Sequence, residues 1–185
     1  YLIYVGSEDP RKDLASLIDA LARIRETDHD VELLKIGKAH FADERERLVS
    51  RAQMLGVGDA LHFLNDVTDE DLPALYSLAR VCVMPSLYEG FGFPVLEAMA
   101  CGTPVVAAEA SSLTELVGDA GLLVPPRHPI QLADAISRLL EPAHWSRDWR
   151  ALGRCRASQF TWERTARQTV EVYEAVRSRR PAHVA

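Results

Sequence analysis

Short apolar runs alternate with stretches of helical periodicity along most of this sequence. Apolar residues recur at helical spacing between the runs, as in Leu14, Leu17, Ile18 and Leu21. These runs lie at residues 2–5, 31–36, 60–64, 81–84, 105–108 and 121–124, and they are continuous except for Glu32 and Lys35 in the second run and His62 in the third. Strands that are apolar on both faces are typical of a parallel sheet covered by helices on both sides. The sequence therefore predicts a doubly wound, Rossmann-like α/β domain.

The helices expected between and after these strands have recognisable ends. Asp9-Pro10 is a suitable cap and first position for the first helix, and Asp69 to Leu72 places acids in the first turn of another. After Pro125-Pro126 the pattern is helical only, which predicts a helical C-terminal extension and no second domain. The expected helices lie at residues 14–24, 44–55, 69–79, 94–101, 130–140, 148–160 and 162–176.

Composition is that of one globular domain in a reducing compartment. The 185 residues are 48% hydrophobic and 26% charged, and no apolar run approaches the roughly 20 residues of a membrane-spanning helix. Cys82, Cys101 and Cys155 form neither a disulfide framework nor a CxxC pair. The net charge of −6 argues against a nucleic-acid-binding surface. The chain opens directly on the first strand, with neither a signal peptide nor a starting methionine, so we expect a cytoplasmic piece of a longer protein.

Residues 89–97, with the sequence EGFGFPVLE, form the most informative local motif. Two carboxylates, Glu89 and Glu97, are eight residues apart, and a glycine-rich bend lies between them. Pro94 suits the first turn of a helix, and Gly102 suits its end. The bend and the first turn would present free backbone N–H groups, and these groups and the helix dipole favour anionic, oxygen-rich ligands.

The same edge of the predicted sheet receives several loops. The motif follows the strand at 81–84, and Gly6 and Gly37 follow two other strands. Ligands of doubly wound sheets bind beyond the carboxyl ends of the strands, where the strand order reverses. The sequence therefore predicts a site for a ligand with hydroxyls and phosphates at this edge.

This sequence resembles the retaining GT-B glycosyltransferases of the large group 1 family, which includes mannosyltransferases and sucrose synthases. The resemblance rests on segments that follow one another in the family's order: Tyr4-Val5-Gly6 with Arg11-Lys12-Asp13-Leu14, the stretch from Glu89 to Val106, Asp119 to Val124, and Phe160-Thr161-Trp162. In the family, two Rossmann-like domains face each other across a cleft. The resemblance implies that residues 1–185 are the C-terminal, donor-binding domain, and that the N-terminal acceptor domain lies outside this chain.

The resemblance also implies roles for individual residues. Glu97 corresponds to the carboxylate that accepts hydrogen bonds from ribose hydroxyls, and an ionised carboxylate suits two neighbouring hydroxyls. Glu89 corresponds to the acid near the transferred sugar, and Lys12 to the lysine that neutralises the departing diphosphate. Further substrate contacts are expected at Gly6, Ser7, Gly37, Gly90, Phe91, Gly92, Phe93 and Pro94.

One residue of the family pattern is replaced. The family often pairs the lysine with an arginine just after the glycine of the first strand, and Ser7 stands at that place. Arg11, next to Lys12, is the alternative second phosphate ligand. The candidate catalytic residues are therefore Glu89, Lys12 and Arg11, and no metal ligand is expected.

Each assignment has a structural alternative. Glu97 lies among apolar residues of a helix expected to be buried, where an ionised carboxylate needs partners, but it could be a solvent-facing helical glutamate. Glu89 could be a plain loop acid, and Lys12 an exposed lysine at a helix start. Lys35 and Lys38 flank Gly37 where the family binds the nucleotide base, yet we expect a solvated charge pair there.

The Trp162 helix carries an apolar stripe that we expect to serve packing. In the intact family this last helix crosses to the other domain, so the chain by itself would leave an apolar patch exposed.

The function implied by the resemblance is transfer of a hexose from a nucleoside diphosphate sugar to an acceptor hydroxyl, with retention of anomeric configuration. Arg11-Lys12 beside Gly6-Ser7 resembles the mannosyltransferase branch and favours GDP-mannose. No cofactor or metal ion is expected, because the family generally needs none. The lone domain should bind nucleotide and transfer little.

Other interpretations remain open from the sequence. The same fold serves glucosyl- and N-acetylglucosaminyltransferases that use UDP- or ADP-sugars, and a non-catalytic nucleotide-sugar-binding domain would share the motif. A flavodoxin-like receiver is disfavoured, because Glu8-Asp9 runs directly into Pro10-Arg11-Lys12 rather than forming an acidic cluster. The acceptor, whether glycan or lipid-linked, the oligomeric state and any peripheral association of the full-length enzyme with the inner face of the membrane are not determined by the sequence.

Overall fold

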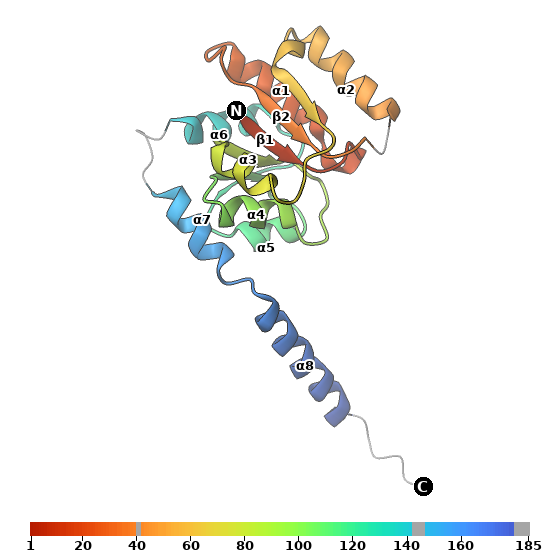
Figure 1. Cartoon of the computed structure of the whole chain (residues 1–185), viewed down its shortest axis with the longest axis vertical. Helices are drawn as coiled ribbons and strands as arrows, with labels where there is room; N and C mark the ends of the chain where they lie inside the picture. The colour runs from red at the N-terminus through yellow and green to blue at the C-terminus, as the bar shows by residue number, and fades with distance from the viewer. Residues whose placement is uncertain (40–41, 142–146, 180–185) are drawn as a thin grey trace.

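The computed structural model describes residues 1–39, 42–141 and 147–179, which form one six-stranded sheet with helices on both faces (Figure 1). The strand order is β3-β2-β1-β4-β5-β6, and every neighbouring pair is parallel. The strands are β1 (Leu2–Val5), β2 (Leu33–Ile36), β3 (Leu61–Leu64), β4 (Val81–Met84), β5 (Val105–Ala108) and β6 (Leu122–Val124). This topology confirms the predicted doubly wound, Rossmann-like fold.

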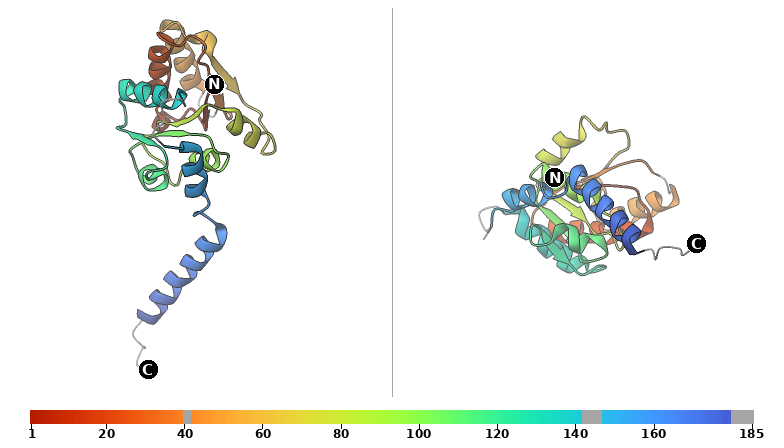
Figure 2. Two further views of the ribbon diagram at one scale, coloured as in Figure 1. Left: turned by 90° about the vertical axis from the view of Figure 1, so that its left-hand side faces the viewer. Right: turned by 90° about the horizontal axis from the view of Figure 1, so that it is seen from below.

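The helices divide into two layers. On one face α1 packs against α2 and α6, and on the other face α4 packs against α3, α5 and α7. The helices are α1 (Leu14–Arg25), α2 (Ala42–Met54), α3 (Leu72–Leu78), α4 (Phe93–Ala100), α5 (Ser112–Val117), α6 (Pro129–Leu140), α7 (Trp149–Ala157) and α8 (Trp162–Arg179), with 3₁₀ turns η1 (Pro10–Lys12) and η2 (Gly58–Ala60). The last helix, α8, extends away from the domain in Figure 1 and in the left view of Figure 2.

The burial of the strands follows their place in the sheet. All residues of β4 and β5 are buried, whereas β3, at the edge of the sheet, alternates between half-buried and exposed side chains. The uninterrupted apolar runs of the sequence are therefore explained by helices on both sides of the central strands. None of the helices in the described ranges combines the length and apolarity needed to cross a membrane.

The prediction that Asp9-Pro10 forms the cap and first position of the first helix was wrong. Asp9 caps the separate turn η1, where its side chain accepts a hydrogen bond from the Arg11 N–H, and α1 begins only at Leu14. Asp13, between the turn and the helix, has a left-handed backbone with φ 51°. A residue in that conformation breaks the helical path, so the Asp9-Pro10 signal belongs to the turn.

The helix predicted from Asp69 begins at Leu72 instead. The Thr68 hydroxyl accepts from the Asp71 N–H at 3.2 Å and donates to the Asp71 carboxylate at 2.8 Å, which closes a turn before the helix. Helix α5 was not predicted at all, because its six residues are too few to show a helical period.

The reversal of strand order defines the edge where a ligand can bind. From β1 the chain first builds β2 and β3 on one side, and then returns to build β4, β5 and β6 on the other. The segments that follow β1 and β4 therefore lie side by side at the carboxyl edge of the sheet, where doubly wound sheets bind ligands, and we call this place the crevice. We call residues 85–92 the β4–α4 loop.

Gly37, directly after β2, has little room at this edge. Its φ is 119°, and an added Cβ would lie 2.9 Å from the Gly6 carbonyl oxygen, a backbone atom that cannot rotate away. We predict that Gly37→Ala lowers the free energy of unfolding by about 1–3 kcal/mol in urea titrations, from conformational strain and contact together. Gly90→Ala is the control, because a Cβ at Gly90 meets nothing within 4 Å. Equal midpoints for the wild type and Gly37→Ala would contradict this prediction.

Candidate functional site

Lys12 and Glu89 meet at the crevice between β1 and β4. The Lys12 ammonium lies 2.6 Å from Glu89 Oε1, and both side chains are mostly buried. Lys12 comes from η1, after β1, and Glu89 comes from the β4–α4 loop. The fold thus brings together two of the three candidate catalytic residues across the point where the strand order reverses.

The main chain around Glu89 is held from two sides. The Leu87 N–H donates to the Arg11 carbonyl oxygen at 2.7 Å, which ties the loop to η1. The Glu89 N–H donates to Ser111 Oγ, and the Ser112 hydroxyl donates to the Glu89 carbonyl oxygen, each at 2.9 Å. The two serines begin α5 and were not foreseen, because nothing in the local sequence connects them with Glu89. They fix the direction in which the Glu89 side chain leaves the loop.

Backbone N–H groups remain available where α4 begins. The main-chain N–H groups of residues 90–93 donate to no atom in the part of the chain that the structure describes. Gly92, with φ 103°, turns the chain into the helix, and an added Cβ would lie 2.9 Å from Leu113 Cδ2. Pro94 occupies the first turn, as predicted. Free N–H groups at the start of a helix favour anionic oxygens.

Glu97 is exposed, so the prediction of a buried carboxylate was wrong. Helix α4 turns Val95, Ala98 and Met99 toward the core, and position 97 falls on the opposite side of the helix. Tyr76 Oη donates a hydrogen bond to Glu97 Oε2 at 2.9 Å. The Glu97 carboxylate is therefore a surface group held by one buried partner.

Two hollows border Glu97. One, of about 400 Å³, lies between α3 and α4 and includes Tyr76 and Cys101. The other, of about 550 Å³, is lined by an aromatic cluster made of Phe91, Phe93, Phe160 and Trp162. In this cluster the ring centroids of Phe91 and Phe93 are 4.7 Å apart, those of Phe91 and Phe160 6.0 Å, and those of Phe93 and Trp162 6.5 Å. Glu97 thus has open space on two sides.

Arg11 does not share the position of Lys12. Its guanidinium is exposed and forms an ion pair with Asp9 at 2.9 Å, inside the same turn. Hydrogen bonds from Arg11 lower the pKa of the Asp9 carboxyl. Ser7, at the place of the family arginine, accepts a hydrogen bond from the Tyr4 hydroxyl with its carbonyl oxygen at 3.1 Å. Lys12 is therefore the cation that the structure brings to Glu89.

Lys35 was expected to be solvated, and it is instead fully buried. Its ammonium lies 2.5 Å from Glu8 Oε1 and donates to the Gly37 carbonyl oxygen at 2.7 Å. Arg45, from α2, donates to the same Glu8 oxygen. We call Glu8, Lys35 and Arg45 the charge cluster. Lys38 does stay exposed and lies 3.6 Å from Asp66.

The charge cluster shifts the pKa values of its members. Burial alone would raise the pKa of Glu8, but hydrogen bonds and charges from Lys35 and Arg45 outweigh burial and lower it. Burial lowers the pKa of Lys35, and the hydrogen bond and charge of Glu8 make this decrease smaller. The cluster joins the segment after β1 to β2 and α2, and so supports the turn that carries Lys12.

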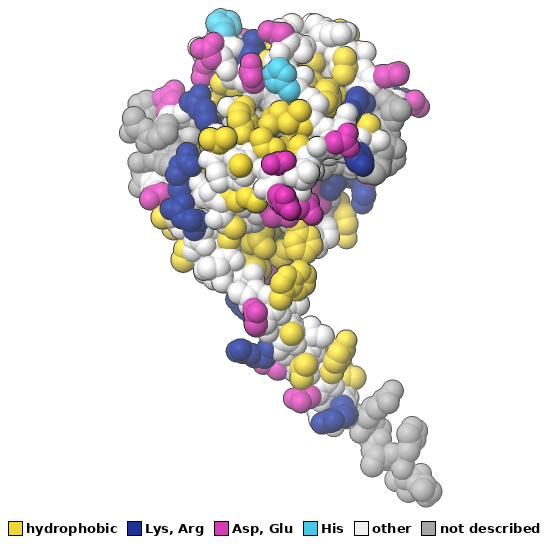
Figure 3. All heavy atoms as spheres, in the orientation of Figure 1, with side chains coloured by type: hydrophobic (Ala, Val, Ile, Leu, Met, Phe, Trp, Pro, Cys, Tyr) yellow, Lys and Arg dark blue, Asp and Glu magenta, His cyan; other side chains and the backbone are white. Residues whose placement is uncertain are grey.

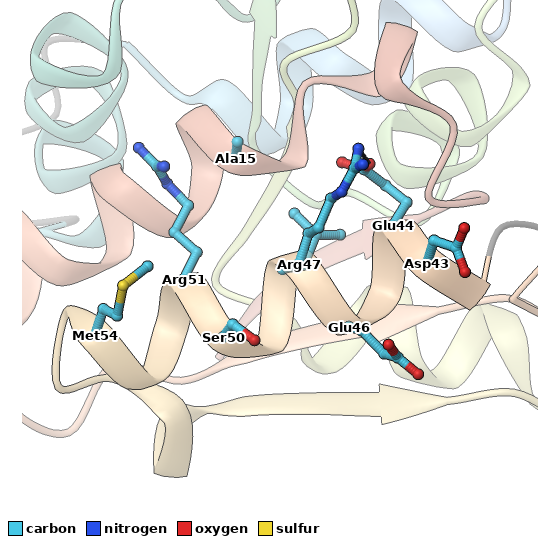
Figure 4. A pocket seen from close by; sticks show the side chains of 9 residues that line it. Ala15, Asp43, Glu44, Glu46, Arg47, Ser50, Arg51 and Met54 are labelled. Atoms are coloured by element: carbon cyan, nitrogen blue, oxygen red, sulfur yellow. Dashed lines mark hydrogen bonds and ion pairs between the residues drawn. The ribbon is translucent and has the colours of Figure 1, made fainter.

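A separate hollow lies along α2, where Figure 4 shows Arg47 and Arg51 on the side of the helix that faces α1. Arg51 is held by both oxygens of Asp19 at 2.7 and 2.6 Å, and Arg47 lies 3.4 Å from Glu44. Both arginines already have partners, and none of the candidate site residues lines this hollow. We therefore place the site at the crevice.

Comparisons with known proteins agree with the fold and with the family resemblance of the sequence. The family model described as glycosyl transferases group 1 matches residues 1–142. The chain is 39% identical over 176 residues to the O-antigen chain mannosyltransferase B of Escherichia coli, and 40% identical over 178 residues to the MMP alpha-(1->4)-mannosyltransferase of Mycolicibacterium hassiacum. Each match covers 94% of this chain, but only 45% and 42% of those proteins. The chain thus spans about half the length of the curated relatives it matches.

Solved structures share the fold of this chain. Sucrose-phosphate synthase from Thermosynechococcus elongatus superposes with a TM-score of 0.83 at 37% identity, over 96% of this chain and 45% of that one. Anabaena HepE in complex with UDP and glucose superposes with a TM-score of 0.81 at 28% identity, over 94% of this chain and 48% of that one.

The charge cluster predicts a specific dependence of stability on pH. The folded pKa of Glu8 lies below its ordinary value of 4.5, so its ion pairs stabilise the fold fully above that pH and lose their effect as the pH falls through the folded pKa. We predict that Glu8→Gln lowers the free energy of unfolding by roughly 3 kcal/mol near neutral pH, because Lys35 and Arg45 lose their counter-charge.

Urea titrations at a series of pH values measure this effect. The difference between Glu8→Gln and the wild type should shrink below pH 4.5. Asp66→Asn is the control, because its exposed pair with Lys38 should contribute less than about 1 kcal/mol. A difference that stays constant through the acid range would speak against the assigned role of Glu8.

Proposed function

Because the chain belongs to the glycosyl transferases group 1 family, we propose that it is the donor-binding domain of a retaining glycosyltransferase that moves a hexose from a nucleoside diphosphate sugar to an acceptor hydroxyl. The observation that carries this proposal is the contact between Lys12 and Glu89 at 2.6 Å. The contact places a cation and a carboxylate beside the unpaired N–H groups at the start of α4, in the crevice where doubly wound sheets bind ligands.

The diphosphate occupies the start of α4 in this proposal. The N–H groups of residues 90–93 and the positive end of the helix dipole attract its oxygens, and Lys12 supplies a full positive charge from the opposite side of the crevice. Negative charge grows on the diphosphate as the bond to the sugar breaks. Groups already oriented toward that charge lower the barrier, and this electrostatic contribution is usually the largest in such reactions. The proposal needs no metal ion, because Lys12 and the N–H groups supply the counter-charge.

The hexose lies next to Glu89, whose carboxylate accepts hydrogen bonds from sugar hydroxyls. Before the donor binds, Lys12 keeps the Glu89 carboxylate turned into the crevice. Glu97 accepts hydrogen bonds from the ribose hydroxyls, and the two hollows beside it leave room for the ribose. Arg11 would have to leave Asp9 to become a second phosphate ligand, which its exposure permits.

GDP-mannose is the donor that we propose first. Two relatives that are 39% and 40% identical to the chain are named mannosyltransferases. A UDP-sugar is the second candidate, because HepE, at 28% identity, forms complexes with UDP and with UDP-glucose. Saturation-transfer NMR with GDP-mannose, UDP-glucose, UDP-N-acetylglucosamine and ADP-glucose would rank the donors directly.

The remainder of the longer protein is proposed to be the N-terminal acceptor domain, which would cover the bare face of α8. Figure 3 shows hydrophobic side chains where α8 leaves the domain and along one side of that helix. The stripe consists of Trp162, Val170, Tyr173 and Val176, each at least half exposed, and Phe93 at its base is 50% exposed. A monomeric protein rarely leaves such a continuous apolar face uncovered. A cytoplasmic location is also proposed, since the three cysteines are free.

Removal of the Lys12 ammonium tests the phosphate site. We predict that Lys12→Ala raises the dissociation constant of GDP or UDP, whichever binds more tightly, by an amount equivalent to about 1.5–3 kcal/mol in calorimetry, because a charge-assisted contact is lost. Arg47→Ala is the matched control, since it also removes one positive charge but lies on α2 outside the crevice. If Lys12→Ala and the wild type bind the nucleotide equally well, the phosphate role of Lys12 is wrong.

The proposal that sugar transfer needs both domains gives a second prediction. The chain of residues 1–185 should bind the preferred nucleotide sugar and show no measurable sugar transfer, whereas the full-length protein transfers the sugar to acceptor. A radiolabelled donor assay on both proteins at equal concentration makes the comparison. Efficient transfer by the chain alone would refute the need for an acceptor domain.

A further inference from the structure

Tyr76 connects the buried interior to the exposed Glu97. Its side chain is 1% exposed, and its hydroxyl reaches the helix surface to donate to Glu97 Oε2 at 2.9 Å. The Tyr76 main chain is also fixed, because its carbonyl oxygen accepts a hydrogen bond from the buried Thr103 hydroxyl at 2.6 Å. Tyr76, whose hydroxyl donates to Glu97, is therefore held in place by packing and by a second hydrogen bond to its main chain.

The arrangement leaves the two oxygens of Glu97 in different environments. Oε2 is bound by Tyr76, while Oε1 contacts no hydrogen-bond donor among the residues that the structure describes. Burial raises the pKa of the Tyr76 phenol well above its ordinary value, so the hydroxyl stays protonated and remains a donor at neutral pH. A glutamate on an exposed helix face otherwise samples several rotamers, and ordering it on binding costs free energy.

We propose that Tyr76 is a positioning residue for nucleotide binding: its hydroxyl fixes Glu97 Oε2 so that Oε1 is presented to the ribose hydroxyls of the donor. The proposal rests on the proposed function, in which Glu97 binds the ribose, and adds the residue that prepares Glu97 for it. The energetic benefit is that the side chain is oriented before the ligand arrives.

A purely structural role for the same hydrogen bond makes a different prediction. Buried tyrosines usually need a partner for their hydroxyl, so loss of this bond could lower stability without affecting the ligand. Positioning instead predicts a loss confined to ligands that carry ribose hydroxyls. Dideoxynucleotides lack those hydroxyls and separate the two roles.

The experiment compares Tyr76→Phe with the wild type by calorimetry, using UDP, GDP and their 2′,3′-dideoxy forms. Phenylalanine keeps the ring and its packing, and a melting curve verifies that the variant is folded. We expect the dissociation constant of the ribonucleotide to rise roughly threefold to tenfold, and that of the dideoxynucleotide to stay unchanged. Equal weakening of both, or no weakening of either, would overturn the positioning role.

Two further variants complete the test. Tyr1→Phe is the matched control. The Tyr1 hydroxyl donates to the carbonyl oxygen of Leu75 at 2.7 Å, in the helix α3 that also contains Tyr76, and it does not touch Glu97. Glu97→Gln distinguishes the two levels of the proposal: if it leaves the preference for ribonucleotide intact, the ribose site itself is wrong. If it abolishes that preference and Tyr76→Phe does not change it, only the role of Tyr76 is wrong.

Should Tyr76→Phe fail to fold, Glu97→Asp provides a one-sided test from the exposed side. The shorter side chain keeps the charge and withdraws the carboxylate from the Tyr76 hydroxyl. A preference for the ribonucleotide that is undiminished in this variant would overturn the positioning role.

Discussion

The pairing of β1 with β4 determines where this domain can bind a ligand. The chain leaves β1 toward one edge of the sheet and returns to build the other half from β4, so the segments after these two strands face each other across a crevice. Lys12 and Glu89, which are distant in sequence, come within 2.6 Å only because of that pairing. Helix α4 then leads away from the same loop and carries Glu97 on its open face. The order of the strands thus fixes the phosphate, sugar and ribose contacts that we propose.

Much of this architecture could be predicted because the strands carry their own signal. The bounds of β1, β4 and β5 follow directly from uninterrupted apolar runs, which only helices on both faces explain. The grouping of the EGFGFPVLE motif with Lys12 came from the family resemblance. Local patterns could not reveal pairings between distant residues: Lys35 looks like a surface lysine until the fold brings Glu8 and Arg45 to it. Glu97 was misjudged because its apolar neighbours in sequence lie on another side of the helix.

The charge cluster supports the segment after β1, but burying its charges costs folding free energy. Removing three charged groups from water opposes folding, and their mutual attraction recovers that cost only with good geometry. Glu8 Oε2 is buried and has no hydrogen-bond partner in the described residues, so the compensation is incomplete. Breaking this arrangement would nevertheless leave Lys35 buried without a counter-charge. The segment after β1 is therefore restricted to one conformation, and the turn that carries Lys12 begins directly behind it.

The aromatic cluster connects the start of α8 to the β4–α4 loop. Trp162 belongs to the first turn of α8 and meets Phe93, which meets Phe91 in the β4–α4 loop. Phe160, just before the helix, contacts Phe91 from the other side. Phe93 and Trp162 are 50% and 75% exposed, so these contacts form a series of rings on the surface between the start of α8 and the loop that holds Glu89. Whatever covers the exposed face of α8 in the longer protein would therefore lie next to the bend between the paired acids.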